Sequence, residues 1–251
     1  MLAALAGRRP VETRVALVVA HPDDETLAAG GSLRLMPDLL LVHVTDGAPQ
    51  RLDDAARNGF RSPADYARAR ADELTLALAL SAADPVRETL GIPDQEAVEY
   101  LDEITHRLRA LFAAHRIDHA LTHAYEGGHP DHDAVAFAVH AIGLPTVEFA
   151  GYHADDGGRM VTQQFLPDPR RKITSVTLPP SDLSRKRAML GCFHSQSGML
   201  DHFDPAIERF REAPAYDFSR PPHPGELLYE QWGWMDGTAW RERAGRSRCV
   251  A

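Results

Sequence analysis

The chain has 251 residues, of which 44% are apolar and 25% charged, and its 27 basic and 36 acidic residues give a formal net charge of −9. These values are typical of a globular protein that is long enough for one large core. The acidic balance argues against nucleic acid or an anionic membrane as the main partner. We therefore expect one domain over residues 1–251 that acts on a small molecule.

The two cysteines, Cys192 and Cys249, lie far apart in the sequence and neither belongs to a C-x-x-C pair. A disulfide framework and a thiolate zinc site are therefore not expected. Residues 1–20 do not form a signal peptide, because Arg8-Arg9-Pro10 interrupts a short apolar stretch. No run reaches the roughly 20 apolar residues that span a bilayer. We expect a cytoplasmic protein without a membrane segment.

The first elements in chain order are two buried strands with a short helix between them. The continuous apolar run Val15–Ala20 is rich in β-branched residues, which is typical of a strand buried on both faces of a parallel sheet. Leu39–Thr45 is expected to be a second buried strand. Thr26–Leu35 is expected to be a helix. Asp46-Gly47 predicts a turn that ends the second strand, and residues 47–61 are expected to be irregular.

Strands and helices then alternate up to about residue 150. A capping serine followed by proline predicts that a helix begins at Ser62-Pro63 and extends to Leu80. Apolar spacing and β-branched residues predict the elements that follow, which are a strand at Val86–Leu90, a helix at Gln95–Ala114, a strand at His119–Thr122, a helix at Asp131–Ile142 and a strand at Thr146–Tyr152.

After residue 155 the pattern changes. Arg159–Phe165 and Ile173–Leu178 have the pattern of antiparallel strands, and Ser181-Asp182 is expected to cap a helix that reaches Phe193. Residues 213–236 are rich in proline and aromatic residues, which more often pack in a core than form a sugar platform.

The alternation predicts an α/β fold with a doubly wound, mostly parallel, Rossmann-like sheet in a core of residues 13–155. Residues 156–251 would add an antiparallel, loop-rich extension. In the commonest strand order the first and fourth strands are neighbours, and ligands bind at the carboxyl ends of the strands between them.

Two polar clusters follow these two strands. The segment Ala20-His21-Pro22-Asp23-Asp24-Glu25 comes after the first, and His129-Pro130-Asp131-His132 comes after the fourth. Imidazole nitrogens and carboxylate oxygens suit zinc and several other divalent ions. We expect His21, Asp24 and His132 to hold Zn²⁺, or another divalent ion, with one position left for water. Such an ion lowers the pKa of its water to about 7.

The remaining polar residues of the clusters are candidates for the chemistry. Asp23 could accept the proton of the attacking water, and His129 could stabilise an oxyanion or protonate a leaving amine. Asp131 could fix the tautomer of His129 or His132. Other interpretations remain open, because Asp23 and Asp131 could cap helices and His129 could itself bind the metal.

The two clusters together resemble the LmbE/PIG-L-type zinc deacetylases, which act on N-acetylglucosaminyl groups. The resemblance extends from about Val15 to Ile142. It implies zinc held by His21, Asp24 and His132, with Asp23 as general base and His129 as the acid or electrostatic catalyst.

Further segments look like features of this family. Thr45-Asp46-Gly47 and the pair Arg70/Glu73 are among them, and the resemblance implies that Arg70 and Asp46 help to bind substrate. Arg70 could instead form a helix-face ion pair with Glu73. Gly127 stands where some members have a tyrosine, and the nearest tyrosine is Tyr125.

Three other histidines, His43, His119 and His123, lie within or beside strands, and we expect structural roles for them. The substrate pocket is expected to use loops 47–61 and 213–236. The sequence favours hydrolysis of an N-acyl, mainly N-acetyl, group on an amino sugar or sugar conjugate. An amidase for a non-sugar or thiol-conjugate amide at the same site is the alternative. A non-catalytic nucleotide-binding module is disfavoured, since no glycine-rich phosphate motif is present.

Overall fold

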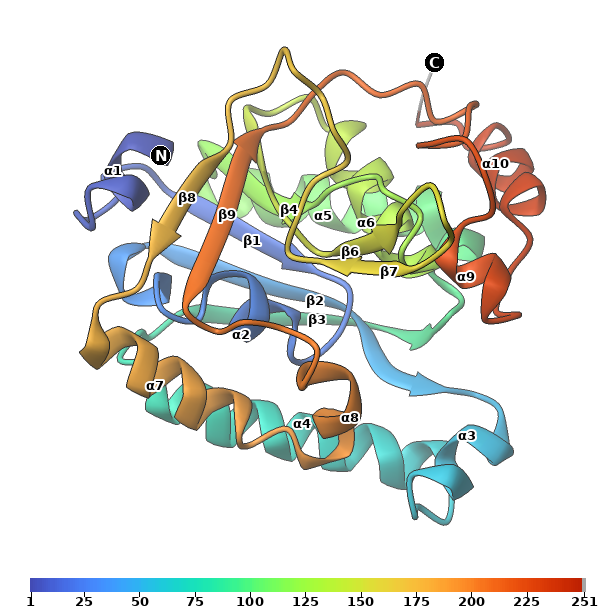
Figure 1. The fold of residues 1–251 in the computed structure, drawn as a ribbon, viewed down its shortest axis with the longest axis horizontal. Coiled ribbons are helices and arrows are strands. Elements are labelled where there is room, and N and C mark those ends of the chain that lie inside the picture. Colours follow the sequence, from blue (N-terminus) through green and yellow to red (C-terminus); the bar gives the residue numbers. More distant parts are fainter. Residues whose placement is uncertain (250–251) are drawn as a thin grey trace.

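In the computed structural model, which describes residues 1–249, a sheet lies between two layers of helices (Figure 1). The strands of this seven-stranded sheet are, in spatial order, β3 (Val86–Asp94), β2 (Leu39–Pro49), β1 (Val15–Val19), β4 (His119–His123), β5 (Thr146–Phe149), β9 (Ile207–Glu212) and β8 (Thr174–Thr177). The first five are parallel to one another, and β9 runs antiparallel to both of its neighbours, β5 and β8. The expected doubly wound, mostly parallel sheet is thereby confirmed.

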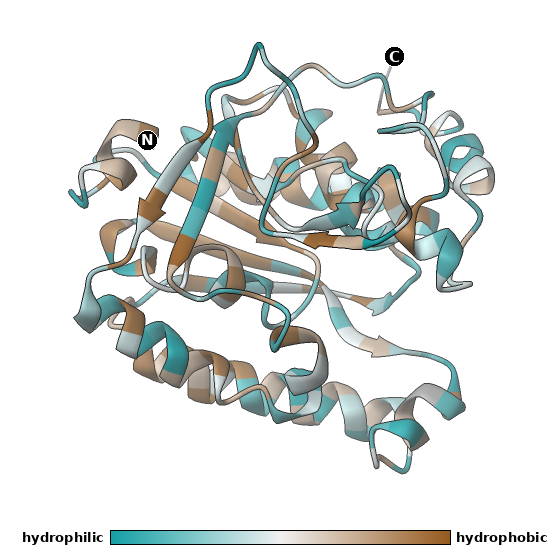
Figure 2. Cartoon of the chain, viewed as in Figure 1, coloured by the Kyte–Doolittle hydropathy of each residue, from teal (hydrophilic) through white to brown (hydrophobic). Residues whose placement is uncertain are grey.

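Strand β1 shows why the sheet is covered on both sides. All five of its side chains are buried. Ala16 and Val18 belong to the apolar core on one face, and Leu17 and Val19 belong to the core on the other. Because successive side chains of a strand point to opposite faces, a continuous apolar run requires helices above and below. Figure 2 shows these central strands in brown.

Helices from different parts of the chain form the two outer layers. The layer over Leu17 and Val19 contains α1 (Leu2–Ala6), α2 (Asp24–Ala29), α4 (Pro63–Leu80) and α7 (Pro180–Leu190). The opposite layer contains α5 (Leu101–His115), α6 (Pro130–His140) and α10 (Gly237–Ala244). The shorter elements are α3 (Leu52–Arg57), α8 (Ser197–Leu200), α9 (Leu228–Gln231) and the 3₁₀ turns η1 (Leu33–Leu35), η2 (Ala97–Tyr100) and η3 (His194–Gln196).

The order of the strands fixes where a ligand can bind. Strand β1 pairs with β2 on one side and with β4 on the other. The chain continues from β1 to β2 on one side, and from β4 to β5 on the other side. The two connections diverge, so a crevice forms at the carboxyl ends of β1 and β4. This arrangement agrees with the strand order expected from the sequence.

The segment after β2 differs from its prediction. The strand does not end at Asp46-Gly47 but continues to Pro49, where it still pairs with Asp94 of β3 after two register shifts. Gly47 has a φ of +69°, so the expected turn residue makes an irregularity within the strand instead. Part of the expected irregular segment forms α3.

Helix α7 begins one residue before its expected cap. Its N-cap is Pro179, and Pro180 occupies the first helical position, where a missing N–H costs nothing. The side chain of Asp182 is therefore free for another role. Its carboxylate is 1% exposed and forms ion pairs with Arg8, Arg34 and Arg185, which tie α7 to the first 34 residues.

The C-terminal third contributes to two sheets. Strand β8 lies within the expected Ile173–Leu178 and pairs antiparallel with β9. Strand β7 (Met160–Thr162) is shorter than expected and pairs antiparallel with β6 (Tyr152–Ala154) in a separate two-stranded sheet. The division of the domain into residues 13–155 and 156–251 stays a prediction.

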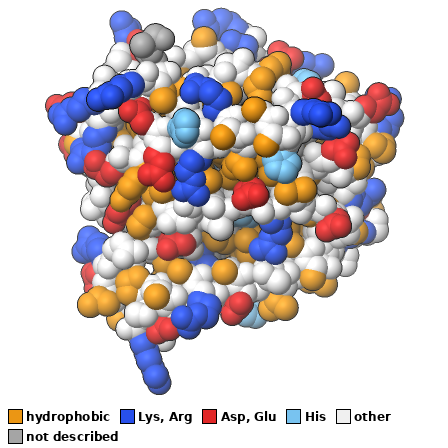
Figure 3. Space-filling model, turned by 180° about the vertical axis from the view of Figure 1, so that it is seen from behind, with side chains coloured by type: hydrophobic (Ala, Val, Ile, Leu, Met, Phe, Trp, Pro, Cys, Tyr) orange, Lys and Arg blue, Asp and Glu red, His pale blue; other side chains and the backbone are white. Residues whose placement is uncertain are grey.

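The surface of the described residues carries charges of both signs. On the face turned away from Figure 1, Lys and Arg side chains lie among Asp and Glu side chains and scattered hydrophobic ones (Figure 3). Among residues 1–249, no helix combines the length and the apolar character that crossing a bilayer requires.

Candidate metal centre

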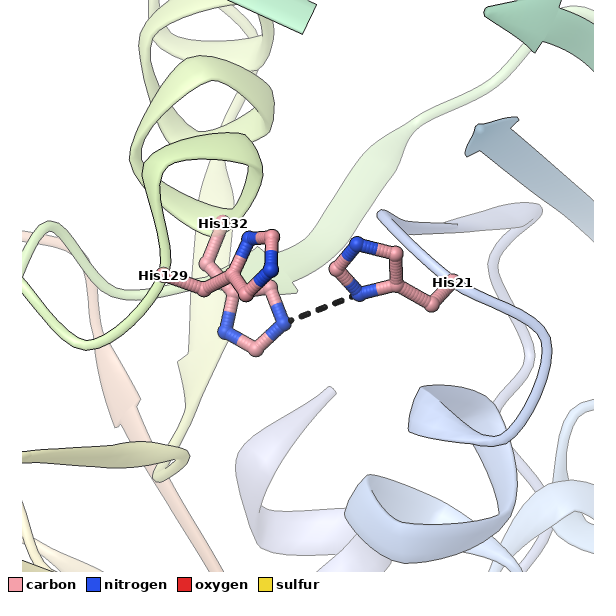
Figure 4. A group of neighbouring side chains, drawn as sticks. All are labelled: His21, His129 and His132. Carbon is pink, nitrogen blue, oxygen red and sulfur yellow. Dashed lines mark hydrogen bonds between the residues drawn. The ribbon is translucent and has the colours of Figure 1, made fainter. Parts of the chain in front are cut away.

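The two polar clusters meet at the carboxyl ends of β1 and β4. His21 and Asp24 come from the loop after β1 and the start of α2, and His129 and His132 come from the start of α6. Figure 4 shows the imidazole of His21 facing the rings of His129 and His132 across the crevice. All four residues are buried, at most 6% exposed.

Three of these side chains form a triangle of possible ligand atoms. Nδ1 of His21 lies 3.3 Å from Nε2 of His132 and 3.3 Å from Oδ2 of Asp24. Nε2 of His132 lies 3.4 Å from Oδ1 of Asp24. Tetrahedral zinc with ligand bonds near 2.0–2.2 Å separates its ligand atoms by about 3.3–3.6 Å. Each pair among the three side chains therefore has the spacing of ligands on a tetrahedral divalent ion, with Oδ2 of Asp24 facing His21 and Oδ1 facing His132. His129 also has ligand spacing to His21 and His132.

A third strand end completes the surroundings of His21. Its Nε2 lies 3.0 Å from Oδ1 of Asp94 and 3.3 Å from Oδ2 of Asp131. Since an ionised carboxylate only accepts, Nε2 donates in this contact, and Nδ1 is the ring nitrogen that faces Asp24 and His132. A carboxylate behind a histidine orients metal ligands in this way.

The charges around His21 favour a cation. Burial by itself lowers the pKa of His21, but Asp94, Asp131 and Asp24 raise it well above its usual value. The negative charge of these carboxylates, which favours a proton on the ring of His21, would equally favour a metal ion bound to a ring nitrogen.

Asp94 was missed by the sequence reasoning. It is the last residue of β3, whereas the strand was expected to end at Leu90. A polar residue at the carboxyl end of a parallel strand is the signal that identified the two clusters, so the correct strand end would also have identified Asp94.

His123 lies beside the triangle but has another partner. Its Nε2 accepts a hydrogen bond of 3.0 Å from the backbone N–H of Ala20, and its ring stacks on His132 at 3.9 Å between centroids. Burial and the neighbouring His132 lower its pKa to about 3. Asp24, His123 and His132 also have ligand spacing, but the Ala20 N–H uses the lone pair that His123 would need. The contacts thus support the structural role expected for His123.

Asp23 has a strained backbone and a charged partner. Its φ is 139°, in the region that side chains rarely adopt, and its side chain makes no cap hydrogen bond, so the capping interpretation is wrong. Oδ2 accepts a hydrogen bond of 2.8 Å from Nη2 of Arg70. Burial raises the pKa of the Asp23 carboxyl to about 8, against the lowering effect of Arg70.

Glu25 and His43 hold the backbone next to Asp23. Oε2 of Glu25 accepts from the N–H of Asp23 at 3.0 Å and lies 3.1 Å from Nε2 of His43. Thr26 donates its hydroxyl proton to Oε1. Glu25 is fully buried and His43 is 3% exposed, which supports the structural role expected for His43.

The tautomer of His129 is set by its own helix. His129 is the N-cap of α6, and its Nδ1 accepts a hydrogen bond from the N–H of Asp131 at 3.1 Å. The neutral ring therefore carries its proton on Nε2, which lies 3.6 Å from Oδ1 of Asp94. Burial lowers the pKa of His129 well below its usual value.

The carboxylate of Asp131 contacts a different histidine from those expected. It lies against His21 rather than His129 or His132, and it accepts from the N–H groups of Gln95 and Ala97. It therefore neither sets the tautomer of the two α6 histidines nor caps its own helix, because its position directs it toward η2.

Of the two residues expected to bind substrate, Arg70 lines the cavity and Asp46 does not. Arg70 is 3% exposed and lines the cavity in front of the clusters, where it donates to the carbonyls of Gly47 and Pro22 as well as to Asp23. The ion pair with Glu73 is not formed, since Glu73 accepts from Ser195. Asp46 accepts from the N–H of Ala48 and is not among the residues that line this cavity.

The cavity has a volume of about 560 Å³. The expected loops contribute Arg57, Asn58, Trp232 and Trp234 to its lining. Gln196, Met199, Leu200 and Phe203, which the sequence did not assign to the pocket, also line it. Six polar residues of the two clusters and of β3 also line it, and Asp131 does not. The six are His21, Asp23, Asp24, Asp94, His129 and His132.

Tyr125 is not part of this cavity. Its ring packs against Phe218 and Trp240, and its hydroxyl donates to the carbonyl of Arg220 at 2.9 Å. Two other tyrosines, Tyr66 and Tyr152, line the cavity, and the ring of Tyr152 lies 5.3 Å from that of His132.

Solved structures with the same fold share little sequence with this chain. The A40926 pseudoaglycone deacetylase Dbv21 is 18% identical, with a TM-score of 0.63 over 82% of this chain and 99% of its own. The hydratase GalB, from Pseudomonas putida KT2440, acts on 4-carboxy-2-hydroxymuconate and is 16% identical, with a TM-score of 0.59 over 81% and 98%. N,N'-diacetylchitobiose deacetylase from Pyrococcus horikoshii is 17% identical, with a TM-score of 0.53 over 81% and 85%.

No curated protein matches the chain. The family described as PIG-L, GlcNAc-PI de-N-acetylase, matches residues 16–142, which are just over half of the chain and carry both polar clusters. The resemblance expected from these clusters is confirmed, and the chain belongs to the PIG-L family.

Proposed function

We propose that the chain is a zinc-dependent hydrolase that removes an N-acyl group, in the simplest case acetyl, from an amino sugar or a sugar conjugate. Family membership supports the deacetylase activity. The observation that carries the proposal is the triangle of His21, Asp24 and His132 beside Asp23. When bound there, the ion would polarise the amide carbonyl and acidify a water molecule.

The residues around the triangle divide the chemistry among them. Asp23 accepts the proton of the attacking water, and Arg70 holds its carboxylate in place. His129 presents Nε2–H to the crevice because its Nδ1 is engaged by the helix. This tautomer favours a hydrogen bond to the developing oxyanion. Asp94 and Asp131 keep Nδ1 of His21 directed at the metal position.

The fold alone does not fix the reaction, because the hydratase GalB shares it. The test is to load the protein with Zn²⁺, measure the bound metal, and follow acetate release from N-acetylglucosamine conjugates. We expect about one zinc ion per chain and metal-dependent release. A protein that retains no metal, or that retains zinc and hydrolyses no amide, would contradict the proposal.

The amidase alternative uses the same catalytic groups. Parallel assays with N-acetyl amino sugars and with non-sugar acetamides, including thiol conjugates, separate the two. A preference for sugars supports the first function, and faster turnover of the non-sugar amides would replace it by the second.

A further inference from the structure

Tyr152 lines the catalytic cavity, and its hydroxyl has no partner in the protein. The residue belongs to β6 and is 9% exposed. No group within residues 1–249 forms a hydrogen bond with its hydroxyl oxygen, although that oxygen is not sealed from the cavity. Polar groups at such buried positions normally have a hydrogen-bond partner. The hydroxyl is therefore in a position to bind a ligand in the cavity.

The other tyrosine that lines the cavity provides a contrast. The hydroxyl of Tyr66 accepts a hydrogen bond of 2.6 Å from Nε2 of Gln196, which also donates to the carbonyl of Ser195. Tyr66 thereby belongs to a network that joins α4 to η3. Of these two tyrosines, only Tyr152 has a hydroxyl that no residue of the described chain engages.

The phenol ring of Tyr152 lies beside the metal triangle. Its centroid is 5.3 Å from that of His132, and the two rings meet edge to face at 68°. Burial raises the pKa of the Tyr152 hydroxyl well above its usual value, and the carboxylates of Asp24 and Asp94 raise it further. The hydroxyl thus lies within range of the charges that surround the metal position, and it remains a hydrogen-bond donor.

Two glycines allow β6 to approach the loop that precedes His129. A β-carbon on Gly128 would lie 2.0 Å from the backbone carbonyl oxygen of Tyr152. Gly127 has a φ of +73°, and a β-carbon there would lie 2.7 Å from a methyl carbon of Leu227. Larger residues in this loop would therefore displace β6 or Leu227. Because the loop ends at His129, the N-cap of α6, the same approach brings the phenol and His129 to one cavity.

Packing holds the ring in place. Tyr152 belongs to an apolar cluster with Ala154, Phe203 and Leu228, and its ring contacts those of Phe203 and Trp232 at 6.1 and 6.0 Å between centroids. A donor that is already held in position needs no reorganisation when negative charge develops on a substrate. The phenol is therefore suited to a role in the transition state.

We propose that Tyr152 is a catalytic residue whose O–H donates a hydrogen bond to the carbonyl oxygen of the scissile amide as this oxygen becomes negative. The inference rests on the proposed function for the identity of that bond. The phenol keeps its proton throughout, so the contact adds electrostatic stabilisation and changes no covalent bond. His129, with Nε2–H in the same cavity, supplies a second donor. The reacting oxygen then has donors from two separate segments, β6 and the start of α6.

Removal of the hydroxyl alone tests this role. Tyr152→Phe keeps the ring and its packing, so we expect the zinc content and the KM for an N-acetylglucosamine conjugate to stay the same. The kcat should fall about 10²-fold or more, which is the usual effect of losing one donor to an oxyanion. Tyr125→Phe is the matched control, because it removes a tyrosine hydroxyl outside the cavity and should leave kcat unchanged.

Two kinetic results would overturn the inference. An unchanged kcat in Tyr152→Phe would show that the hydroxyl does not contact the reacting oxygen. A higher KM at an unchanged kcat would place the hydroxyl on a group of the substrate that does not change during the reaction. In both cases the unsubstituted protein would still release acetate, so the proposed function would stand.

A tetrahedral analogue gives a measurement that needs no turnover. The probe is the methylphosphonamidate of glucosamine, whose anionic oxygens imitate the charge on the reacting carbonyl, and glucosamine is the reference ligand. Calorimetry with zinc-loaded protein should show about 10²-fold weaker binding of the analogue in Tyr152→Phe, with equal binding of glucosamine. Equal losses for both ligands, or no loss for either, would contradict the inference. A selective loss in a protein that hydrolyses no amide would sustain the hydroxyl as the donor to a tetrahedral anion and overturn the proposed function.

Discussion

At Asp23 the protein places a carboxylate in a backbone conformation that its neighbours must maintain. A φ of 139° costs about 1–3 kcal/mol in a residue with a side chain. Arg70 fixes the carboxylate from one side, and Glu25 binds the backbone N–H from the other. The strain is therefore balanced by two buried charged groups, which position Asp23 beside the metal triangle.

Replacing the carboxylate tests its role as base. Asp23→Asn keeps the size of the side chain and removes its ability to accept a proton, so we expect kcat to fall by about 10²–10⁴-fold. Zinc content should stay the same, because Asp23 is not one of the three triangle residues. Metal analysis and steady-state kinetics check this. An unchanged rate would exclude Asp23 as the base.

Glu25 is expected to act through Asp23 as a positioning residue. Glu25→Ala removes the acceptor for the N–H of Asp23 and the partner of His43, and we expect kcat to fall by up to about 10²-fold with little change in KM. Glu25→Gln retains an acceptor oxygen and should recover most of the rate. The conservative variant also serves as the control for folding. Equal losses in both variants would indicate that charge rather than position matters.

At the level of elements, a buried ion pair joins α7 to β9. Lys186 and Glu208 are at most 1% exposed, and Nζ lies 3.0 Å from Oε1. Lys186 also donates to the carbonyl of Leu27, and Glu208 accepts from the N–H of Gly31 and the hydroxyl of Ser32. The pair thereby fixes the end of α2, whose first residue is a metal-triangle residue.

Removal of one charge of this pair should be costly. Lys186→Met leaves Glu208 buried without a cation, so we expect the free energy of unfolding to fall by about 3–5 kcal/mol. The double variant Lys186→Met/Glu208→Gln removes the second charge but keeps acceptors for Gly31 and Ser32, and should recover part of the loss. Denaturant unfolding measures both. A double variant no more stable than Lys186→Met would contradict the explanation.

Strands β5 and β9 contain a second buried pair, which titrates near neutral pH. Oε2 of Glu148 accepts a hydrogen bond from Nε of Arg211 at 2.9 Å. Burial raises the pKa of Glu148 to about 7, against the lowering effect of Arg211 and Tyr216 and with a raising effect of Glu126. His140 faces the other carboxylate oxygen at 3.8 Å.

The raised pKa predicts a dependence of stability on pH. The folded protein holds the Glu148 proton more tightly than the unfolded chain, in which the pKa is 4.5. This contribution is complete below about pH 4.5 and is lost as the pH rises to about 7. The stability of the protein relative to Glu148→Gln should therefore fall over this range, by about 1.4 kcal/mol for each unit of pKa shift. Parallel stability curves for the two proteins would contradict the raised pKa.

For the whole molecule, metal binding should stabilise the fold. The triangle joins the loop after β1 to the start of α6, and a ligand that binds only the folded state adds about 2.7 kcal/mol at one hundred times its Kd. We expect Zn²⁺ to raise the melting temperature and a chelator to lower it. His132→Ala should abolish the zinc-dependent shift. A shift of the same size in this variant would place the stabilising ion elsewhere.

Much of the fold was predictable because its signals are local. The apolar runs of β1 and β2 and the Ser62-Pro63 start of α4 can be read from neighbouring residues. The length of β2 was not predictable, because its last residues are strand only through pairing with β3. The N-cap of α7 is Pro179, two positions before the expected Ser181, since two consecutive prolines and a distant arginine cluster competed with the local capping signal.

The sequence by itself determined the family, the adjacency of the first and fourth strands and the meeting of the two polar clusters between them, because a polar cluster at the end of a buried strand can lie only at the edge where parallel strands end. Tertiary structure decided what surrounds them. Asp94 contacts His21 although 73 positions separate them, Arg70 contacts Asp23 across 47 positions, and the cavity is lined by residues from several separate segments. Such contacts depend on how elements pack in space, and the local pattern of residues along the chain carries no record of that packing.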